Sequence, residues 1–338
     1  TLLPRYWSPS FQAATGEWRY GLLTGSSDPL GRHAYALEVL RGSATGRLDA
    51  AAVYQYDRFW PTLTVAAQDT TAPEAGGTLL LRNREVNVSV GLPLTRSFRM
   101  AQSVSVGWRL RKESLENAPG FAPLNLGGLE LAWYLSSAKL YPYSISPTDG
   151  WQVQLAYLKE DPFFGGDVSL GKMTFDGRGY LRLGTEKTVL AVRLGGGATF
   201  GSPRFVQSFA VGGFPEGSLS DVIDTNFTVL RGYPDDAFFG RSFVHGNLEY
   251  RFPLLFPEHG FRSLPFFLRH LHGAVFADAA SVWVGPFKAS DVRTAVGAAV
   301  GFDMSLSQAF PLTATFGVAR GLQTLGETRV YARLGLSF

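Results

Sequence analysis

Several features that would place this chain in a common soluble class are scarce or absent. Charged residues make up only 17% of the 338 residues, well below the roughly 25% of an ordinary soluble domain. Cysteine is absent, which fits a protein of the cell envelope, although many cytosolic proteins also have few cysteines. The net charge is only +3 and the basic residues are scattered, so a nucleic-acid partner is not predicted. No uninterrupted apolar run reaches about 18 residues, which argues against helical membrane spans.

The dominant pattern in the sequence is alternation with a period of two. Val86, Val88 and Val90, for example, alternate with the polar residues Asn87 and Ser89. Successive side chains of a strand point to opposite faces, so each such segment has one apolar and one polar face. Hydrophobic residues reach 45%, yet the mean hydropathy is only +0.03, because polar residues dilute the apolar ones. A span in lipid must satisfy its backbone hydrogen bonds internally, and a closed barrel does this without helices.

A soluble β-sandwich would also alternate, but three further features favour a membrane barrel. The alternating segments are about 8–12 residues long, which matches a tilted strand that crosses the hydrocarbon layer. Their polar faces repeatedly carry arginine or glutamate, which suits a watery lumen. Aromatic residues gather near the ends of the segments, as in the interfacial girdles of membrane barrels.

The alternation predicts an all-β fold, a 16-stranded antiparallel transmembrane β-barrel over residues 17–338. An even number of strands is expected when both termini lie on the periplasmic side. Residues 1–16 contain Pro4 and Pro9 and are expected to form a lead-in rather than a strand. The predicted strands are 17–25, 33–41, 47–57, 62–68, 84–92, 101–111, 127–136, 151–159, 173–184, 188–199, 203–212, 242–252, 272–283, 293–304, 311–320 and 328–338.

A long connection, residues 213–240, separates the eleventh and twelfth predicted strands. It contains the run Leu230, Arg231, Gly232 and Tyr233. Connections of this length in compact structures are usually functional or disordered. Taken alone, the run could be a glycine turn with a solvated arginine.

The strands after this connection carry two acidic residues that are expected to face the lumen. Glu249 alternates with apolar neighbours, and Asp278 would be costly on the lipid side of a membrane span. A guanidinium is permanently charged and forks to carboxylates, so Arg231 could fold inward and pair with one or both of them. The two carboxylates could instead form an acid–base pair, but a neighbouring cation keeps carboxylates ionised and favours a structural ion pair.

Four segments together resemble the BamA-like superfamily, the bacterial surface antigen barrels. These barrels insert outer-membrane proteins or export partner proteins in two-partner secretion. Leu230–Tyr233 resembles the (Val/Ile)-Arg-Gly-(Phe/Tyr) signature of the family. The segments 247–253 and 274–283 resemble its next strand and its Phe-x-Asp strand, and 333–338 resembles its closing strand.

The resemblance implies a bacterial outer-membrane barrel with 16 strands and a loop folded inward between strands 11 and 12. Arg231 would lie inside the barrel and pair with Glu249 and Asp278. The first strand would meet the last at a weak seam that opens sideways, and Phe338 would serve as the C-terminal assembly signal. The expected partners are outer-membrane lipid, client outer-membrane or secreted proteins, and accessory periplasmic proteins or lipoproteins. The family's periplasmic repeats are absent from these residues, so residues 1–16 are expected to lead in from an upstream periplasmic module.

Two other functions stay open at this point: a passive outer-membrane channel, and a barrel that anchors an upstream periplasmic domain. An enzyme is not predicted, because no catalytic motif stands out, and no cofactor is expected. The pair His270-x-His272 is a weak metal signal, and it is expected to be two polar residues that enter a strand. No metal site is therefore predicted.

Overall fold

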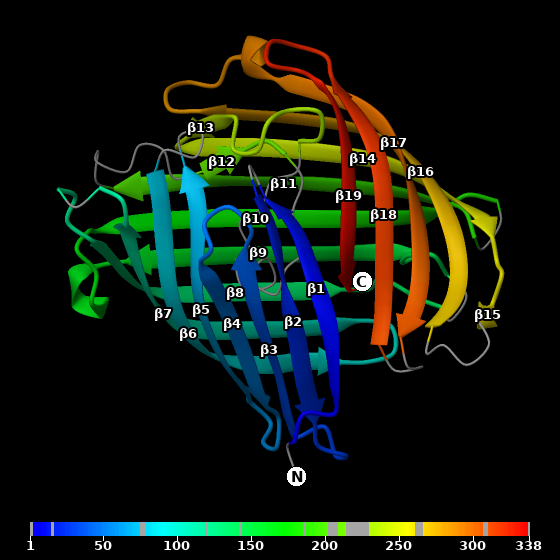
Figure 1. Cartoon of the computed structure of the whole chain (residues 1–338), viewed down its shortest axis with the longest axis horizontal. Coiled ribbons are helices and arrows are strands. Elements are labelled where there is room, and N and C mark those ends of the chain that lie inside the picture. Colours follow the sequence, from blue (N-terminus) through cyan, green and yellow to red (C-terminus); the bar gives the residue numbers. More distant parts are fainter. Residues whose placement is uncertain are drawn as a thin grey trace.

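The chain forms one large antiparallel sheet in the computed structural model (Figure 1). The helical segments among the described residues are two single turns, η2 (Pro162–Phe164) and η4 (Ala289–Asp291). Within the described part of the chain, no helix has the length and apolar character needed to cross a membrane. The structure describes residues 3–14, 17–74, 79–118, 120–141, 144–184, 187–201, 209–213, 230–260, 266–306 and 310–336.

Most of the strands overlap the alternating segments of the sequence. They are β1 (Tyr6–Ala14), β2 (Glu17–Ser27), β3 (His33–Gly42), β4 (Leu48–Tyr56), β5 (Thr62–Glu74), β6 (Leu79–Arg96), β7 (Ala101–Leu115), β8 (Leu124–Ser136), β9 (Gly150–Glu160), β10 (Leu170–Arg182), β11 (Val189–Gly201), β12 (Phe209–Val211), β13 (Phe238–Gly240), β14 (Ser242–Leu255), β15 (His259–Gly260), β16 (Phe266–Trp283), β17 (Arg293–Leu306), β18 (Phe310–Gly321) and β19 (Thr328–Leu336).

The large sheet contains 17 of these strands, one of which is the two-residue β15 beside β16. Sixteen strands of nine residues or more therefore remain in the described ranges, in agreement with the predicted number. Their order is that of the chain, and each long strand pairs antiparallel with the next. The predicted fold class is confirmed, but two of the predicted segments, residues 1–16 and 203–212, are wrong.

The first correction concerns residues 1–16, where the sequence predicts a lead-in. Residues 6–14 instead form β1, which pairs along its whole length with β2. Pro9 lies in the middle of this strand, opposite Leu22. Proline removes a backbone donor and is confined to edge strands and bulges of sheets. Because β1 is an edge strand, it accommodates Pro9. In the sequence the same proline argues against a strand at this position.

The second correction concerns the predicted strand 203–212. Residues 202–208 lie outside the described part of the chain. Phe209–Val211 forms β12, which pairs with β13 in a separate two-stranded sheet and is not part of the barrel wall. Alternation shows that one face is apolar, but it does not show whether that face meets lipid or a neighbouring loop.

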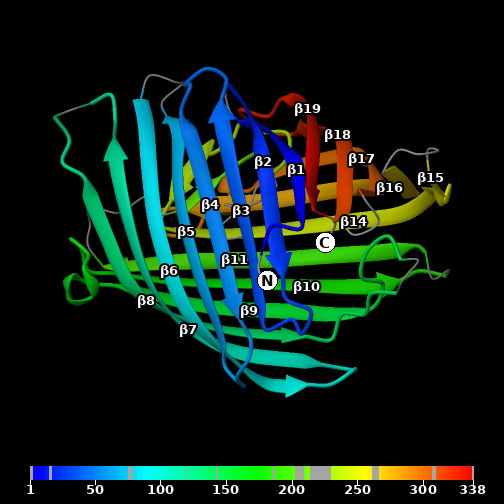
Figure 2. The same cartoon turned by 60° about the horizontal axis from the view of Figure 1, so that its bottom comes forward.

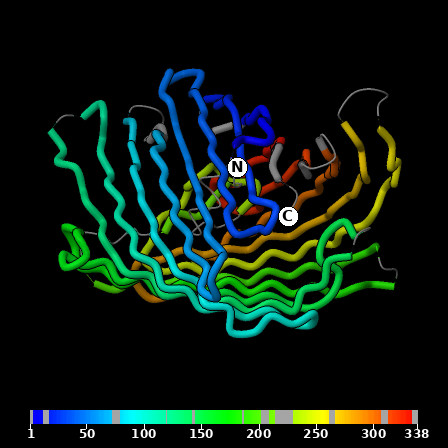
Figure 3. Tube along the Cα trace, turned by 90° about the horizontal axis from the view of Figure 1, so that it is seen from below, coloured from blue at the N-terminus to red at the C-terminus, as the bar shows by residue number. Residues whose placement is uncertain are grey.

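The sheet curves round until its two edge strands, β1 and β19, lie beside each other (Figure 2). In Figure 3 the tube runs from the blue first strands through the green middle strands, and the red last strands return to the blue ones. Every other pair of neighbouring long strands is joined by a backbone ladder. Among the described residues, no such ladder joins β1 to β19. We call the end of the barrel where β1 begins and β19 ends the terminal end.

The two faces of the wall differ as the alternation predicts. On β14, Leu248 and Tyr250 are exposed on the outer face, whereas His245 and Asn247 are buried on the inner face. Apolar side chains remain exposed on the outside of a membrane barrel because lipid, rather than water, surrounds them. The inner face is therefore the place where buried polar groups must find partners.

Candidate functional site

The long connection between β11 and β14 returns into the barrel and packs on its inner wall. Its two described parts meet where Gly213 forms an isolated bridge with Leu230 and where β12 pairs with β13. Leu230 and Tyr233 have no exposed surface at all, although both belong to a connection rather than to a strand. Burying one such side chain stabilises a fold by about 1.5–3 kcal/mol.

An apolar cluster, which we call the loop core, attaches the connection to the wall. Its buried members come from the connection itself and from the inner faces of β14, β16 and β17, and the partly buried Phe238 and Val282 pack against them. A hydrophobic core thus lies inside the barrel. The buried members are Phe209, Val211, Leu230, Tyr233, Phe243, Ala280 and Ala295.

Arg231 leaves the loop core and binds both of the acidic residues that the sequence singles out. Its Nε and Nη2 donate to Oδ2 and Oδ1 of Asp278 at 2.7 and 2.6 Å, a bidentate pairing. Its Nη1 donates to Oε1 of Glu249 at 2.7 Å. The Asp278 side chain is fully buried and that of Arg231 is 6% exposed, so water contributes little to either charge.

Two further polar side chains join this cluster. Asn247 donates from Nδ2 to Oδ1 of Asp278 at 2.9 Å, and Arg251 donates from Nε and Nη2 to Oε2 of Glu249. The cluster therefore holds two guanidinium groups and two carboxylates and is formally neutral. Each carboxylate is bound by a cation, so the arrangement is a structural clamp and not an acid–base pair.

The guanidinium of Arg231 also lies on the ring of Phe276, with Cζ 3.3 Å from the ring centroid. Phe276 faces Gly297 in the ladder between β16 and β17, and a Cβ at Gly297 would collide with that ring. The missing side chain lets the ring lie flat against the wall. The cation thus rests on an aromatic surface in a cation–π contact.

Gly232 and Tyr233 attach the same run to the last strands of the barrel. Gly232 has φ +83°, and a Cβ there would lie 2.5 Å from the backbone nitrogen of Gly321. The Tyr233 hydroxyl donates to the carbonyl of Thr294 at 3.0 Å. Arg329 on β19 donates from Nη1 to the Tyr233 carbonyl at 2.8 Å. The connection is therefore tied both to the wall at β14 and β16 and to the strand that forms one edge of the sheet.

The structure thus brings together Arg231, Glu249 and Asp278, with Leu230, Gly232 and Tyr233 beside them, whereas Phe338 lies outside the described residues. Phe276 and Arg329 are contacts of the connection that the sequence does not predict. Phe276 could have been found from its position two residues before Asp278 on the same face. The contact from Arg329 depends on how the loop is placed in space.

Comparisons with known proteins agree with this architecture. A family model described as the Omp85 superfamily domain matches residues 80–338. No curated protein sequence matches the chain at a significant level.

Three solved structures have the same fold. The chain is similar to BamA from Haemophilus ducreyi lacking POTRA domains 1–3 (TM-score 0.64, 15% identity, covering 97% of this chain and 69% of that one). It is similar to CdiB from Escherichia coli (TM-score 0.67, 14% identity, covering 100% of this chain and 64% of that one). It is also similar to CdiB from Acinetobacter baumannii (TM-score 0.59, 15% identity, covering 96% of this chain and 57% of that one). The chain thus spans about two thirds or less of the length of these structures.

Proposed function

Because the chain belongs to the Omp85 superfamily and is an integral barrel of the bacterial outer membrane, we propose that it inserts or translocates client proteins through a seam between β1 and β19. The main support is the gap in backbone pairing at this position among the described strands. An unpaired strand edge presents free N–H and C=O groups, to which an incoming strand can add. The proposed role involves no enzymatic step, as is general for barrels of this superfamily.

The clamp on Arg231 supports transport of proteins over passive flow of solutes. A connection packed against the inner wall occupies part of the lumen, which argues against a large permanently open channel. Its contact with Arg329 also ties it to one edge of the proposed seam. In this proposal, movement of β19 during opening is coupled to the position of the connection.

Further parts of the proposal concern the ends of the chain and its partners. We propose that the residues before β1 lead in from a periplasmic module and that Phe338 acts as the signal for assembly into the membrane. The clients would be outer-membrane or secreted proteins, and accessory periplasmic proteins or lipoproteins would assist. The greater length of the similar structures is compatible with an additional module.

A reversible lock across the seam tests the proposal. Phe11 is exposed on β1, and Val330 is exposed on β19. A cysteine replaces Phe11, and a second one replaces Val330 or Ala332, in the otherwise cysteine-free chain. The pair that forms a disulfide across the seam on oxidation is used for the test. The barrel is then placed in lipid vesicles, and the folding rate of an unfolded small outer-membrane barrel is measured with the seam oxidised and after reduction.

We expect the reduced barrel to accelerate client folding and the oxidised one to lose that acceleration. A matched control joins Thr24 to Leu37, which face each other in the ladder between β2 and β3, and should have no effect. Equal acceleration with a locked seam would refute the lateral opening. Large stable conductance of the unaltered barrel in a planar bilayer, without any acceleration, would favour the passive channel.

A further inference from the structure

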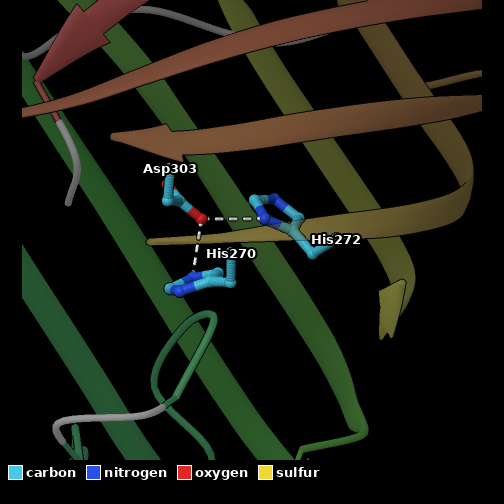
Figure 4. Close-up of side chains that lie close together, drawn as sticks. All are labelled: His270, His272 and Asp303. Carbon is cyan, nitrogen blue, oxygen red and sulfur yellow. Dashed lines mark ion pairs between the residues drawn. The ribbon is translucent and has the colours of Figure 1, made fainter. Parts of the chain in front are cut away.

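Three side chains with metal-ligating atoms converge on the inner wall near the terminal end. His270 and His272 lie on β16, and Asp303 lies on β17 (Figure 4). Oδ2 of Asp303 is 2.8 Å from Nε2 of His270 and 2.9 Å from Nδ1 of His272. In the sequence the two histidines are only a weak metal signal. The carboxylate that changes this interpretation lies more than thirty residues further along the chain.

The register of the two strands explains why these groups meet. His270 faces Asp303 directly in the ladder, and His272 faces Gly301. Residues two apart on a strand share a face, so all three side chains point to the lumen. A Cβ at Gly301 would collide with the imidazole of His272, so the glycine provides the space in which this ring lies.

His270 and Asp303 are buried, His272 is partly buried, and two ligating atoms of the cluster lack a hydrogen bond. His270 is 5% exposed and Asp303 is 4% exposed. Nδ1 of His272 and Oδ2 of Asp303 approach each other closely, yet within the described structure neither of these buried atoms has a hydrogen bond of good geometry. Buried polar atoms in native proteins usually have partners, and a bound ion is one recognised reason for an exception.

The other carboxylate oxygen of Asp303 has a dedicated partner. The hydroxyl of Thr313 on β18 donates to Oδ1 at 2.5 Å, and Thr313 faces Asp303 in the next ladder. This bond holds the carboxylate with Oδ2 turned toward the histidines. Hydrogen bonds of this kind to ligating carboxylates orient them in metal sites.

We propose that His270, His272 and Asp303 bind one divalent transition-metal ion of the Zn²⁺ class. Two imidazole nitrogens and one carboxylate oxygen are the donor set that Zn²⁺ accepts with a fourth position left to water, whereas Mg²⁺ and Ca²⁺ prefer oxygen donors. The ligating atoms lie within 4.8 Å of one another. Tetrahedral bonds of about 2.0–2.1 Å would separate them by roughly 3.3 Å, so small side-chain shifts suffice.

A second buried histidine shows what distinguishes this cluster. Nε2 of His245 lies 3.9 Å from Oδ2 of Asp176, but this carboxylate already binds Arg178 and Arg193 at 2.8 and 2.5 Å. Two guanidinium groups next to a carboxylate disfavour a metal cation by charge repulsion. The partners of Asp303, in contrast, are the two histidines and Thr313. A metal ion would link β16 to β17, and this role does not depend on the proposed transport of proteins.

Zinc binding to the folded, chelator-treated barrel in detergent tests the site. The unaltered chain should bind one Zn²⁺ in a titration against a chromophoric chelator, and Co²⁺ in its place should give visible absorption. The double variant His270→Gln with His272→Gln should lose stoichiometric binding. Thr313→Val keeps all three ligands and should bind about tenfold to a hundredfold more weakly, because only the orienting hydrogen bond is lost.

The control variant His245→Gln removes a buried lumenal histidine outside the cluster and should bind Zn²⁺ as the unaltered chain does. Folding of each variant is checked by heat-modifiable mobility on a gel, and Asp303→Asn replaces the double variant if that variant does not fold. Failure of the unaltered barrel to bind Zn²⁺ would overturn the proposal. Binding that persists unchanged in the folded double variant or in Asp303→Asn would overturn it equally.

Discussion

Two walls of the barrel bury carboxylates beside an arginine, but the arginines come from different places. In the wall formed by β6 to β9, Arg109 of β7 lies 4.0 Å from Glu85 and 3.5 Å from Glu160. Gly128 lies opposite both Arg109 and Glu160 in the ladders of β8, so no side chain stands between them. In the wall formed by β14 to β17, the cation is Arg231, which arrives from the connection.

This difference changes what each ion pair does. The pairing of Arg109 follows from strand register alone and forms when the wall forms. The pairing of Arg231 forms only when the connection folds into the lumen, so it contributes to the position of the connection as well as to the wall. Its contacts are also shorter, at 2.6 to 2.7 Å, and include a bidentate pair. Removing each arginine should therefore give different results.

The largest effect is expected for Arg231→Ala. It leaves the fully buried Asp278 without its cation, and breaking a buried pair in this way costs about 3–5 kcal/mol. The urea midpoint of the barrel in lipid vesicles should fall, and the conductance in a planar bilayer should rise because the connection is released. The comparison variant, Arg109→Ala, should lower the midpoint less and leave the conductance unchanged. Equal conductance changes in both variants would remove the distinction between the two walls.

The same contrast shows how much of the molecule could be predicted from sequence. Period-two alternation identifies the long strands other than β1, because lipid outside and polar partners inside impose it along each one. It does not reveal the contact of Arg109 with Glu160, which depends on the register across three strands. It also does not bring Asp303 to His270, because a ladder partner lies at no fixed distance along the chain. The residue types alone allow Arg231 to pair with Glu249 or Asp278, and the resemblance of several short motifs to a known family makes pairing with both the expectation.

An intermediate effect is expected for Gly232→Ala. The left-handed backbone at φ +83° costs a residue with a side chain about 1–2 kcal/mol. The new Cβ would also press on the backbone of Arg320 and Gly321, and such overpacking costs about 1–3 kcal/mol more. Gly46 in the turn between β3 and β4 has φ +65° and open space around it, so Gly46→Ala measures the backbone cost alone. Equal shifts of the urea midpoint for both variants would mean that Gly232 does not pack against the last strands.

The smallest effect is expected for Tyr233→Phe, which keeps the ring in the loop core and removes only its hydroxyl. The variant loses the O–H that lies 3.0 Å from the Thr294 carbonyl and 2.8 Å from Oε1 of Gln323, and the acceptor of the Gln323 N–H at 3.2 Å. A neutral hydrogen bond contributes about 1 kcal/mol, and the Thr294 carbonyl would be left without this donor. The matched variant is Tyr54→Phe on β4. Its hydroxyl lies 2.7 Å from Nδ1 of His33 in a half-buried position, so its loss should lower the stability of the barrel less.

Conductance should stay low in both variants, because Arg231 still holds the connection. A conductance increase in Tyr233→Phe as large as that in Arg231→Ala would mean that the attachment to the last strands, and not the ion pair, keeps the connection in the lumen.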